Sequence, residues 1–346
     1  MGWATSTRME DFAVHGGRLG QARRRFADAP APWIDLSTGV NPIPYPAAPA
    51  NPRARARLPD PEEVTALEEV AACAFGVAAD SILATAGGEA AIRLLAGVLP
   101  TRRVGIVEPT YGGHAQAWRA VDVAVIGIER RDLAAVADAC DVIVVVNPNN
   151  PDGATVPPAT LLELSERMAA RDGWLIVDEA YAEVSPEVSV MAHWHDARRA
   201  DRLIVLRSFG KFYGLPGLRL GFVVARPEVI ALLRARQGEW PVSADAIAAG
   251  LQAYADRPWA DQTRLRLADE ARRLDALLVR SGLEIVGGTS LFRLAAATDA
   301  QDRFRRLAEA GVLTRPFDYA PTWLRLGLPD PDHWPRVQAA LQESVP

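Results

Sequence analysis

The chain contains a single lysine, Lys211, among 38 basic residues. It lies in the stretch SFGKFYG (208–214), between an apolar run and a glycine-containing turn. An arginine side chain stays protonated, whereas a partly buried lysine amine can lose its proton and attack a carbonyl group to form a Schiff base. Because every other basic position is an arginine, the retained lysine indicates covalent chemistry. The alternative is a surface lysine that persists by chance.

Several other polar side chains come soon after apolar runs at 142–146, 175–177 and 203–206. They are Asn150, Asp178, Tyr181 and Ser208, with Arg219 eight residues after the lysine. Parallel α/β sheets bind ligands at the carboxyl ends of their strands, so we expect these side chains to lie together. Taken singly, each has an ordinary alternative: Asp178 could cap a helix, Asn150 could lie in a turn and Arg219 could pair with a surface acid.

Short apolar runs without polar alternation recur through the middle of the chain, and helix-like stretches separate several of them. The runs are 104–107, 121–128, 142–146, 174–177, 203–206 and 218–225. Apolar strands separated by helices are typical of a mostly parallel sheet that is covered on both faces. The predicted fold class is therefore α/β, with a doubly wound sheet in a large domain.

The pattern changes on both sides of this region. Residues 42–61 contain seven prolines and are predicted to form an extended arm without helix. After about residue 235, two helices and then short strands around a further helix indicate a smaller α+β domain. The predicted division is an N-terminal segment 1–45 that completes the small domain, a large domain 46–234 and a small C-terminal domain 235–346.

The composition argues against several classes of protein. Hydrophobic residues make up 49% of the 346 residues, enough for two packed cores. The net charge of −5 gives no basic field, so nucleic acid is not an expected partner. No apolar run approaches the length of a membrane span, and residues 1–11 contain no apolar core of a signal peptide. The spacing of Cys73 and Cys140 does not match that of metal ligands. We expect a cytoplasmic, metal-free protein that acts on a small molecule and has both cysteines in its core.

The order of the polar residues resembles that of the fold type I pyridoxal-phosphate enzymes, the aspartate-aminotransferase-like superfamily, from about residue 30 to the C-terminus. The resemblance implies that Lys211 carries pyridoxal phosphate and that Asp178 pairs with the pyridinium nitrogen, so that the ring can accept electrons. It also implies that Asn150 and Tyr181 bind the phenolic oxygen. Tyr111 matches the aromatic residue that stacks on the ring, and a core tyrosine is the alternative.

The cofactor phosphate requires amide donors and cations. The stretch TAGGEAAI (85–92) follows a short apolar run and opens a predicted helix. Helix N-termini attract anions, so the backbone N–H groups of Gly88 and Glu89 are candidates to bind the phosphate. The resemblance adds the Ser208 hydroxyl and the Arg219 guanidinium.

Candidate substrate-binding residues lie near both ends of the chain. Arg325 matches the arginine with which this superfamily binds a substrate carboxylate, and Arg315 precedes it on a neighbouring element. Two arginines in one pocket indicate a substrate with two anionic groups. His15 and Asn41 are further candidates, although His15 could be an ordinary exposed histidine. The sequence leaves open which of these side chains binds phosphate and which binds carboxylate.

A narrower resemblance covers nearly the whole chain. The stretches HGG (15–17) and WIDLSTGVNP (33–42) are similar to the opening of the L-threonine-O-3-phosphate decarboxylases of cobalamin biosynthesis. Further similar stretches lie at 58–61, 208–222, 239–243 and 287–292. The resemblance implies loss of CO2 from L-threonine O-3-phosphate to give (R)-1-amino-2-propanol O-2-phosphate, carried out by a homodimer.

Two alternatives and one departure remain. An aminotransferase that acts on a phosphorylated substrate such as histidinol phosphate would share every cofactor residue named above. A catalytically silent cofactor-binding module is the other alternative, and the intact Lys211 and Asp178 argue against it. The departure is Leu58, which stands where many relatives have a tyrosine that reaches the neighbouring subunit's cofactor phosphate, so the sequence leaves that contact open.

Overall fold

The structure is a computed structural model that describes residues 10–194 and 201–344. Most of the polar N-terminal stretch 1–11 therefore lies outside the described residues. The described chain divides into two compact units. The larger unit comprises Pro44–Asn150 and Ala154–Gln262, and the smaller unit comprises the residues up to Ile43, Pro151–Gly153 and the residues from Thr263 onward.

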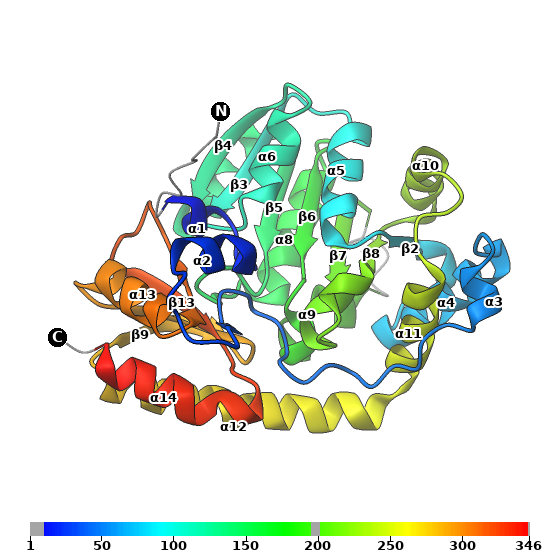
Figure 1. The fold of residues 1–346 in the computed structure, drawn as a ribbon. Helices are drawn as coiled ribbons and strands as arrows, with labels where there is room; N and C mark the ends of the chain where they lie inside the picture. Colours follow the sequence, from blue (N-terminus) through cyan, green and yellow to red (C-terminus); the bar gives the residue numbers. More distant parts are fainter. Residues whose placement is uncertain (1–9, 195–200, 345–346) are drawn as a thin grey trace, which may run out of the picture. The chain divides into compact units, whose positions relative to one another are not determined.

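The larger unit is built on a seven-stranded sheet with the order β2-β8-β7-β6-β5-β3-β4 (Figure 1). The strands are β2 (Ile82–Thr85), β3 (Arg103–Glu108), β4 (Ala124–Glu129), β5 (Val142–Val146), β6 (Trp174–Asp178), β7 (Leu203–Ser208) and β8 (Gly221–Val224). Strand β8 runs antiparallel to both of its neighbours, β2 and β7, and the remaining pairs of strands in this sheet are parallel. This mostly parallel sheet confirms the predicted α/β class.

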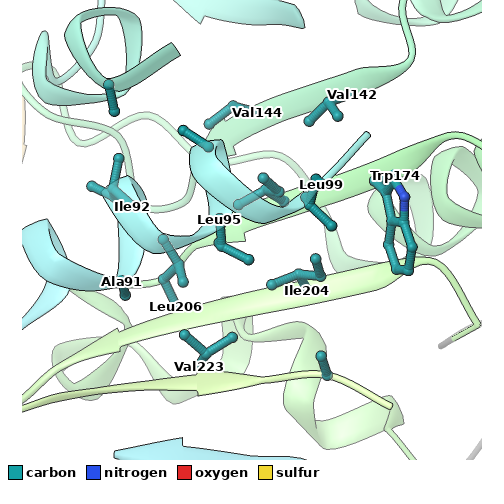
Figure 2. Close-up of a cluster of buried hydrophobic side chains, with 14 of the residues drawn as sticks. Ala91, Ile92, Leu95, Leu99, Val142, Val144, Trp174, Ile204, Leu206 and Val223 are labelled. Carbon is teal, nitrogen blue, oxygen red and sulfur yellow. The ribbon is translucent and has the colours of Figure 1, made fainter. Parts of the chain in front are cut away.

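Helices bury both faces of this sheet. On one face, α5 (Gly88–Val98), α6 (Gly113–Arg119) and α10 (Pro227–Gln237) supply side chains to a core with alternate strand residues. Figure 2 shows Leu95 and Leu99 packed among Val142, Ile204 and other strand side chains. Because both faces are covered, the strands have continuous apolar runs, as the sequence predicts.

Aromatic residues from two helices pack on the other face. Phe75 of α4 (Pro61–Phe75) and Tyr254 of α11 (Ala244–Ala255) lie with ring centroids 5.7 Å and 5.5 Å from that of Phe222 in β8. Helix α8 (Pro158–Ala169) contacts β6. Helix α11 packs against α4 and therefore belongs to the larger unit. The boundary between the two units falls inside α12 (Arg257–Arg280), whereas the sequence analysis places the start of the small domain at residue 235.

The smaller unit combines both ends of the chain. Its antiparallel sheet has the order β12-β13-β10-β9. The strands are β9 (Glu284–Thr289), β10 (Phe292–Ala296), β12 (Arg315–Pro316) and β13 (Trp323–Gly327), and the C-terminal helices are α13 (Ala300–Glu309) and α14 (Trp334–Glu343). Near the N-terminus are α1 (Glu10–Val14), α2 (Leu19–Arg25) and β1 (Ile34–Asp35), which pairs in parallel with β11 (Val312–Leu313).

Two local expectations are wrong. Residues 42–61 are not wholly extended, because a short helix, α3 (Pro52–Arg55), begins there with Pro52 in its first turn and the Asn51 side chain accepting from Arg53 N. Proline is tolerated at that position because no helical partner is lost. Cys140 is buried, but Cys73 is exposed, since it lies on the solvent side of α4. In the described part of the chain, no helix is both long and apolar enough to cross a membrane.

Candidate functional site

A pocket in the larger unit brings together all nine residues that the sequence associates with the cofactor. Its lining includes Gly88, Glu89, Tyr111, Asn150, Asp178, Tyr181, Ser208, Lys211 and Arg219. Five further residues complete the lining: Ile92, Val146, Ala180, Leu206 and Arg207. The structure therefore collects these side chains at one place, while their individual roles stay predictions.

The topology explains why these residues meet. Strands β5, β6 and β7 are adjacent and parallel, so their carboxyl ends lie at the same edge of the sheet. Asn150 follows β5, Asp178 ends β6 and Ser208 ends β7. This edge is where ligands bind in open α/β sheets.

Lys211 is held on a short helix, α9 (Phe209–Phe212), directly after β7. The side chain is half-buried, and Lys211 Nζ lies 5.8 Å from the centroid of the Tyr181 ring. A Cβ atom at Gly210 would be 2.6 Å from the Cα of Pro216, so this turn packs closely against the loop that follows. The close packing fixes the backbone from which the lysine amine extends into the pocket.

Asp178 has a buried partner that the sequence analysis missed. The Nε2 atom of His114 lies 2.8 Å from Asp178 Oδ2, and Ala180 N donates to Asp178 Oδ1 at 3.0 Å. The His114 side chain is 1% exposed. The sequence feature that points to His114 is its spacing from Tyr111, since His114 lies three residues later, at the start of α6. The pair holds the carboxylate in a fixed orientation.

A glycine-lined cradle opens beside the start of α5. Gly87 has φ = +85°, and a Cβ atom there would lie 2.6 Å from Nη2 of Arg219. The guanidinium therefore rests on backbone that only glycine leaves open. Arg219 itself has φ = +56° and donates from Nη1 to Pro216 O at 3.0 Å. Free N–H groups at the helix start and an adjacent cation suit a phosphate group.

The aromatic wall of the pocket is tied to the same helix. Tyr111 donates its hydroxyl to Glu89 Oε2 at 3.1 Å, and Glu89 pairs with Arg93 at 2.8 Å. A Cβ atom at Gly113 would lie 2.3 Å from Cε1 of Tyr111, so glycine allows the ring to approach the backbone. The ring plane is thereby fixed before any ligand binds.

A buried ionic cluster, missed by the sequence analysis, lies next to the pocket-lining residues of β6 and β7. Arg207 donates to Glu179 Oε2 at 2.7 Å and contacts Glu183 Oε1 at 3.1 Å. Glu179 also accepts from the Ser189 hydroxyl at 2.6 Å and from Val190 N at 2.7 Å. Burial raises the pKa of both glutamate carboxyls. The cluster joins the residues after β6, which carry Tyr181, to β7.

In the smaller unit, two predicted substrate arginines face each other. Arg315 of β12 and Arg325 of β13 are direct partners in the antiparallel register. Like charges directly opposite one another destabilise a sheet, so this arrangement favours an anion between or beside them. The Arg325 side chain is almost fully buried, with its guanidinium carbon 5.1 Å from the centroid of the Phe292 ring.

The other two substrate candidates lie in the same unit. His15 is half-buried and follows Val14, whose carbonyl accepts from Arg315 Nη2 at 3.1 Å. Asn41 is buried, and its Oδ1 accepts from Ile43 N at 3.0 Å and from Arg266 Nη2 at 2.8 Å. His15 is therefore adjacent in sequence to a residue that holds one of the arginines, whereas the Asn41 oxygen serves the local structure.

Comparison with known proteins identifies the family. A family model described as "Aminotransferase class I and II" matches residues 31–338. The chain belongs to the class I and II aminotransferase family. Pyridoxal phosphate is the cofactor of this family, which confirms the cofactor expected from the sequence.

Within the class I and II aminotransferases, two similar relatives are named threonine-phosphate decarboxylase. One, from Pseudomonas aeruginosa, is 40% identical over 94% of this chain and 96% of its own length. The other, from a Sinorhizobium species, is 43% identical over 91% of this chain and 93% of its own length. A histidinol-phosphate aminotransferase from Cupriavidus pinatubonensis is 29% identical over 96% of this chain and 93% of its own length.

A solved structure shows the same fold. The histidinol-phosphate aminotransferase of Sinorhizobium meliloti, crystallised with pyridoxal-5'-phosphate, has a TM-score of 0.83, with 99% of this chain and 98% of that chain covered. Its sequence identity is 18%, so the comparison establishes the aminotransferase fold.

Proposed function

We propose that this protein is a pyridoxal-phosphate-dependent lyase that decarboxylates L-threonine O-3-phosphate to (R)-1-amino-2-propanol O-2-phosphate, a step of cobalamin biosynthesis. The observation that carries the choice of reaction is the identity of 40% and 43%, over more than nine tenths of the chain, to relatives named threonine-phosphate decarboxylase. The opposed pair Arg315 and Arg325 supports a substrate with anionic groups.

The pocket of the larger unit fits pyridoxal phosphate. The cradle at Gly87, which a Cβ atom would fill, and the start of α5 suit the phosphate, with Arg219 as the cation. Tyr111 supplies a flat ring beside them, and Asp178 supplies a carboxylate for the pyridinium nitrogen. Lys211 offers the only side-chain amine of the chain for covalent attachment.

The bound cofactor supplies an electron-accepting ring for the bond that breaks at the substrate Cα. Asp178 holds a proton on the ring nitrogen, and His114 keeps that carboxylate oriented through the 2.8 Å contact. Asn150 and Tyr181, which line the same pocket, would donate hydrogen bonds to the phenolic oxygen of the cofactor. The Lys211 amine then moves a proton to Cα, which completes the replacement of CO2 by hydrogen.

The substrate anions are bound by the smaller unit's cations in this proposal. Arg315 and Arg325 each have planar guanidinium groups that can bind carboxylate or phosphate through two parallel hydrogen bonds. His15 adds a third donor near the main-chain carbonyl that holds Arg315. A substrate that lacks either anionic group is expected to bind weakly.

The competing function is transamination of a phosphorylated amino compound such as histidinol phosphate. An aminotransferase breaks the Cα–H bond and needs an oxo acid as second substrate, whereas the decarboxylase breaks the Cα–carboxylate bond and needs none. The relative of that name is 29% identical, compared with 40% and 43% for the two decarboxylases. The lower identity makes transamination the second candidate.

Product analysis separates the two reactions. The purified holoenzyme is incubated with L-threonine O-3-phosphate and no oxo acid, and the products are identified by mass spectrometry. The proposal predicts multiple turnovers to aminopropanol phosphate. A holoenzyme that is inert under these conditions, but converts histidinol phosphate when 2-oxoglutarate is added, is an aminotransferase and contradicts the proposal.

We also propose a cytoplasmic homodimer. Leu58 is 61% exposed in the larger unit, and Trp240 is 55% exposed, so large apolar side chains are available to a second copy of the chain. Sedimentation equilibrium tests this: a dimer is expected for the wild type, with Leu58→Asp weakening association. A monomeric wild type at assay concentration contradicts the assignment.

A further inference from the structure

The N-terminal segment holds both substrate arginines through main-chain carbonyls. Arg315 Nη2 donates to Val14 O at 3.1 Å, and Arg325 Nη2 donates to Ser37 O at 2.7 Å. The two carbonyls belong to residues 23 positions apart, one at the end of α1 and one just after β1. The position of each guanidinium therefore depends on how this segment is folded.

The Ser37 carbonyl is fixed by its own side chain and by Asp35. Asp35 Oδ1 accepts from Ser37 N at 2.9 Å and from Ser37 Oγ at 2.5 Å. Ser37 Oγ in turn accepts from Gly17 N at 2.8 Å. The Ser37 side chain is buried. These bonds tie the turn at 16–17 to residues 35–37.

The neighbouring backbone leaves Ser37 little freedom. Leu36 N donates to Leu313 O at 2.7 Å, and Gly327 N donates to Leu36 O at 2.7 Å. Leu36, the residue before Ser37, is thus attached both to β11 and to the end of β13, the strand that carries Arg325. A carbonyl and the guanidinium that it binds are therefore held on the same rigid frame.

Gly16 packs directly on this carbonyl. A Cβ atom at Gly16 would lie 2.3 Å from Ser37 O and 2.8 Å from Ser37 C. Real Cβ atoms do not approach oxygen so closely, so any larger residue must displace the acceptor of Arg325. We define Gly16, Asp35 and Ser37 as the N-terminal clamp.

Contacts with Ser37 and Phe292 orient the Arg325 guanidinium. Ser37 O binds one Nη2 hydrogen, and the Phe292 ring lies 5.1 Å from the guanidinium carbon. A guanidinium binds a carboxylate or phosphate through two parallel hydrogen bonds only when its plane matches that of the anion. A shift of Ser37 O would rotate or translate that plane, and misplacement by about 1 Å can change rates by about a hundredfold.

We propose that Gly16, Asp35 and Ser37 are positioning residues that orient Arg325 and thereby set the affinity for the anionic substrate. This rests on the proposed role of Arg325 as a substrate ligand. Gly16, Asp35 and Ser37 are not among the residues that line the pocket of the larger unit, so we do not expect cofactor binding to depend on them.

The central test compares two glycine-to-alanine variants of the holoenzyme. Gly16→Ala is expected to raise the KM for L-threonine O-3-phosphate about tenfold or more, with kcat changed much less. Gly20→Ala is the matched control, because a Cβ atom there meets only the flexible end of Arg24 at 3.8 Å. The affinity for pyridoxal phosphate and its absorbance spectrum should be unchanged in both variants.

A second pair of variants tests the carboxylate of the clamp. Asp35→Asn keeps the Oδ1 acceptor for Ser37 and is expected to retain the wild-type KM within about twofold. Asp35→Ala removes the acceptor and is expected to raise KM, as Gly16→Ala does. Equal KM values in Asp35→Asn and Asp35→Ala, or a wild-type KM in Gly16→Ala, overturn the proposal.

Inorganic phosphate separates this proposal from the proposed reaction. With the holoenzyme, phosphate should raise the melting temperature of the wild type and of Gly20→Ala, and should raise that of Gly16→Ala and Arg325→Ala much less. The wild type could fail to decarboxylate threonine phosphate and still show these differences in melting temperature. In that case the proposed reaction is wrong, and the proposed role of the N-terminal clamp is supported. If phosphate stabilises Gly16→Ala as strongly as the wild type, or does not stabilise the wild type, the clamp is wrong.

Discussion

The imidazole of His114 and the carboxylate of Asp178 meet at 2.8 Å between Nε2 and Oδ2, and both side chains are buried. They come from α6 and from the end of β6, so the contact joins a helix to a strand whose last residue lines the pocket. A carboxylate that must hold a proton on the cofactor ring needs a fixed orientation, and this contact supplies it.

Removal of His114 should therefore reduce both activity and cofactor binding. A buried hydrogen-bond partner contributes about 1 to 3 kcal/mol, so His114→Ala is expected to lower kcat/KM by about ten- to a hundredfold. Steady-state kinetics and a pyridoxal phosphate titration measure the two effects. His193, which is exposed, provides the control His193→Ala. Equal activity in the two variants contradicts the assigned role.

Lys211 can be tested by chemical labelling as well as by activity. Lys211→Arg keeps the positive charge but lacks the nucleophilic amine, so it should lose activity and the absorbance of covalently held cofactor. After borohydride reduction, peptide mass spectrometry should find the cofactor on Lys211 of the wild type. The chain has no other lysine, which makes the assignment direct. A fully active Lys211→Arg protein contradicts the proposed chemistry.

The phosphate cradle depends on Gly87. Alanine there would bring Cβ within 2.6 Å of Arg219 Nη2 and would occupy a position with φ = +85°. Gly87→Ala is expected to weaken pyridoxal phosphate binding about tenfold or more, measured by titration of the apoenzyme. Gly97 lies in α5, the helix that Gly87 precedes, and has open space at Cβ, so Gly97→Ala should bind the cofactor normally and fold slightly more stably. Similar affinity in both variants would show that the cradle is misassigned.

The buried cluster of Glu179, Glu183 and Arg207 makes stability depend on pH. Burial raises the pKa of the Glu183 carboxyl, and the positive charge of Arg207 opposes this increase. The charge of Glu179 raises the same pKa further, and Tyr254 is another titratable group that interacts with Glu183. The pKa of Glu183 is therefore higher in the folded state than in the unfolded state. The contribution of this group to the unfolding free energy is fully present below the unfolded-state pKa and is lost as the pH rises through the folded-state pKa. Glu183→Gln cannot ionise and should show a smaller loss of unfolding free energy between about pH 5 and pH 8.

Glu179→Gln is the comparison for this prediction. Glu179 accepts bonds from Arg207, Ser189 and Val190, so replacement of its carboxylate should destabilise the protein at both pH values. Urea unfolding at each pH measures the difference. An identical pH dependence in the wild type and Glu183→Gln would exclude Glu183 as the titrating group.

The sequence predicts the parts of this molecule that follow from local pattern. Unbroken apolar runs predict the parallel strands, because a strand buried on both faces cannot alternate polar and apolar residues. The positions just after those strands, such as Asp178 and Lys211, could be grouped because topology brings carboxyl ends to one edge. The proline-rich pattern does not predict the short helix at Pro52, because proline is tolerated in the first turn of a helix.

The residues that the sequence could not reveal act through contacts between distant segments. His114 contacts Asp178, which is 64 positions later in the sequence, and the Ser37 carbonyl binds Arg325, which is 288 positions later. Arg207 and Glu179 look like ordinary charged residues until the fold buries them together. No spacing rule connects such pairs, since their proximity comes from tertiary packing.

The most direct test of the central claim is to follow which bond at the substrate Cα is broken. L-Threonine O-3-phosphate labelled with ¹³C in its carboxyl group is given to the holoenzyme in D2O without an oxo acid. The account predicts labelled CO2 in equal amount to aminopropanol phosphate, with one deuterium on the aminomethyl carbon. Retention of the labelled carboxyl group together with exchange of the Cα hydrogen for deuterium would contradict it and would identify aminotransferase chemistry.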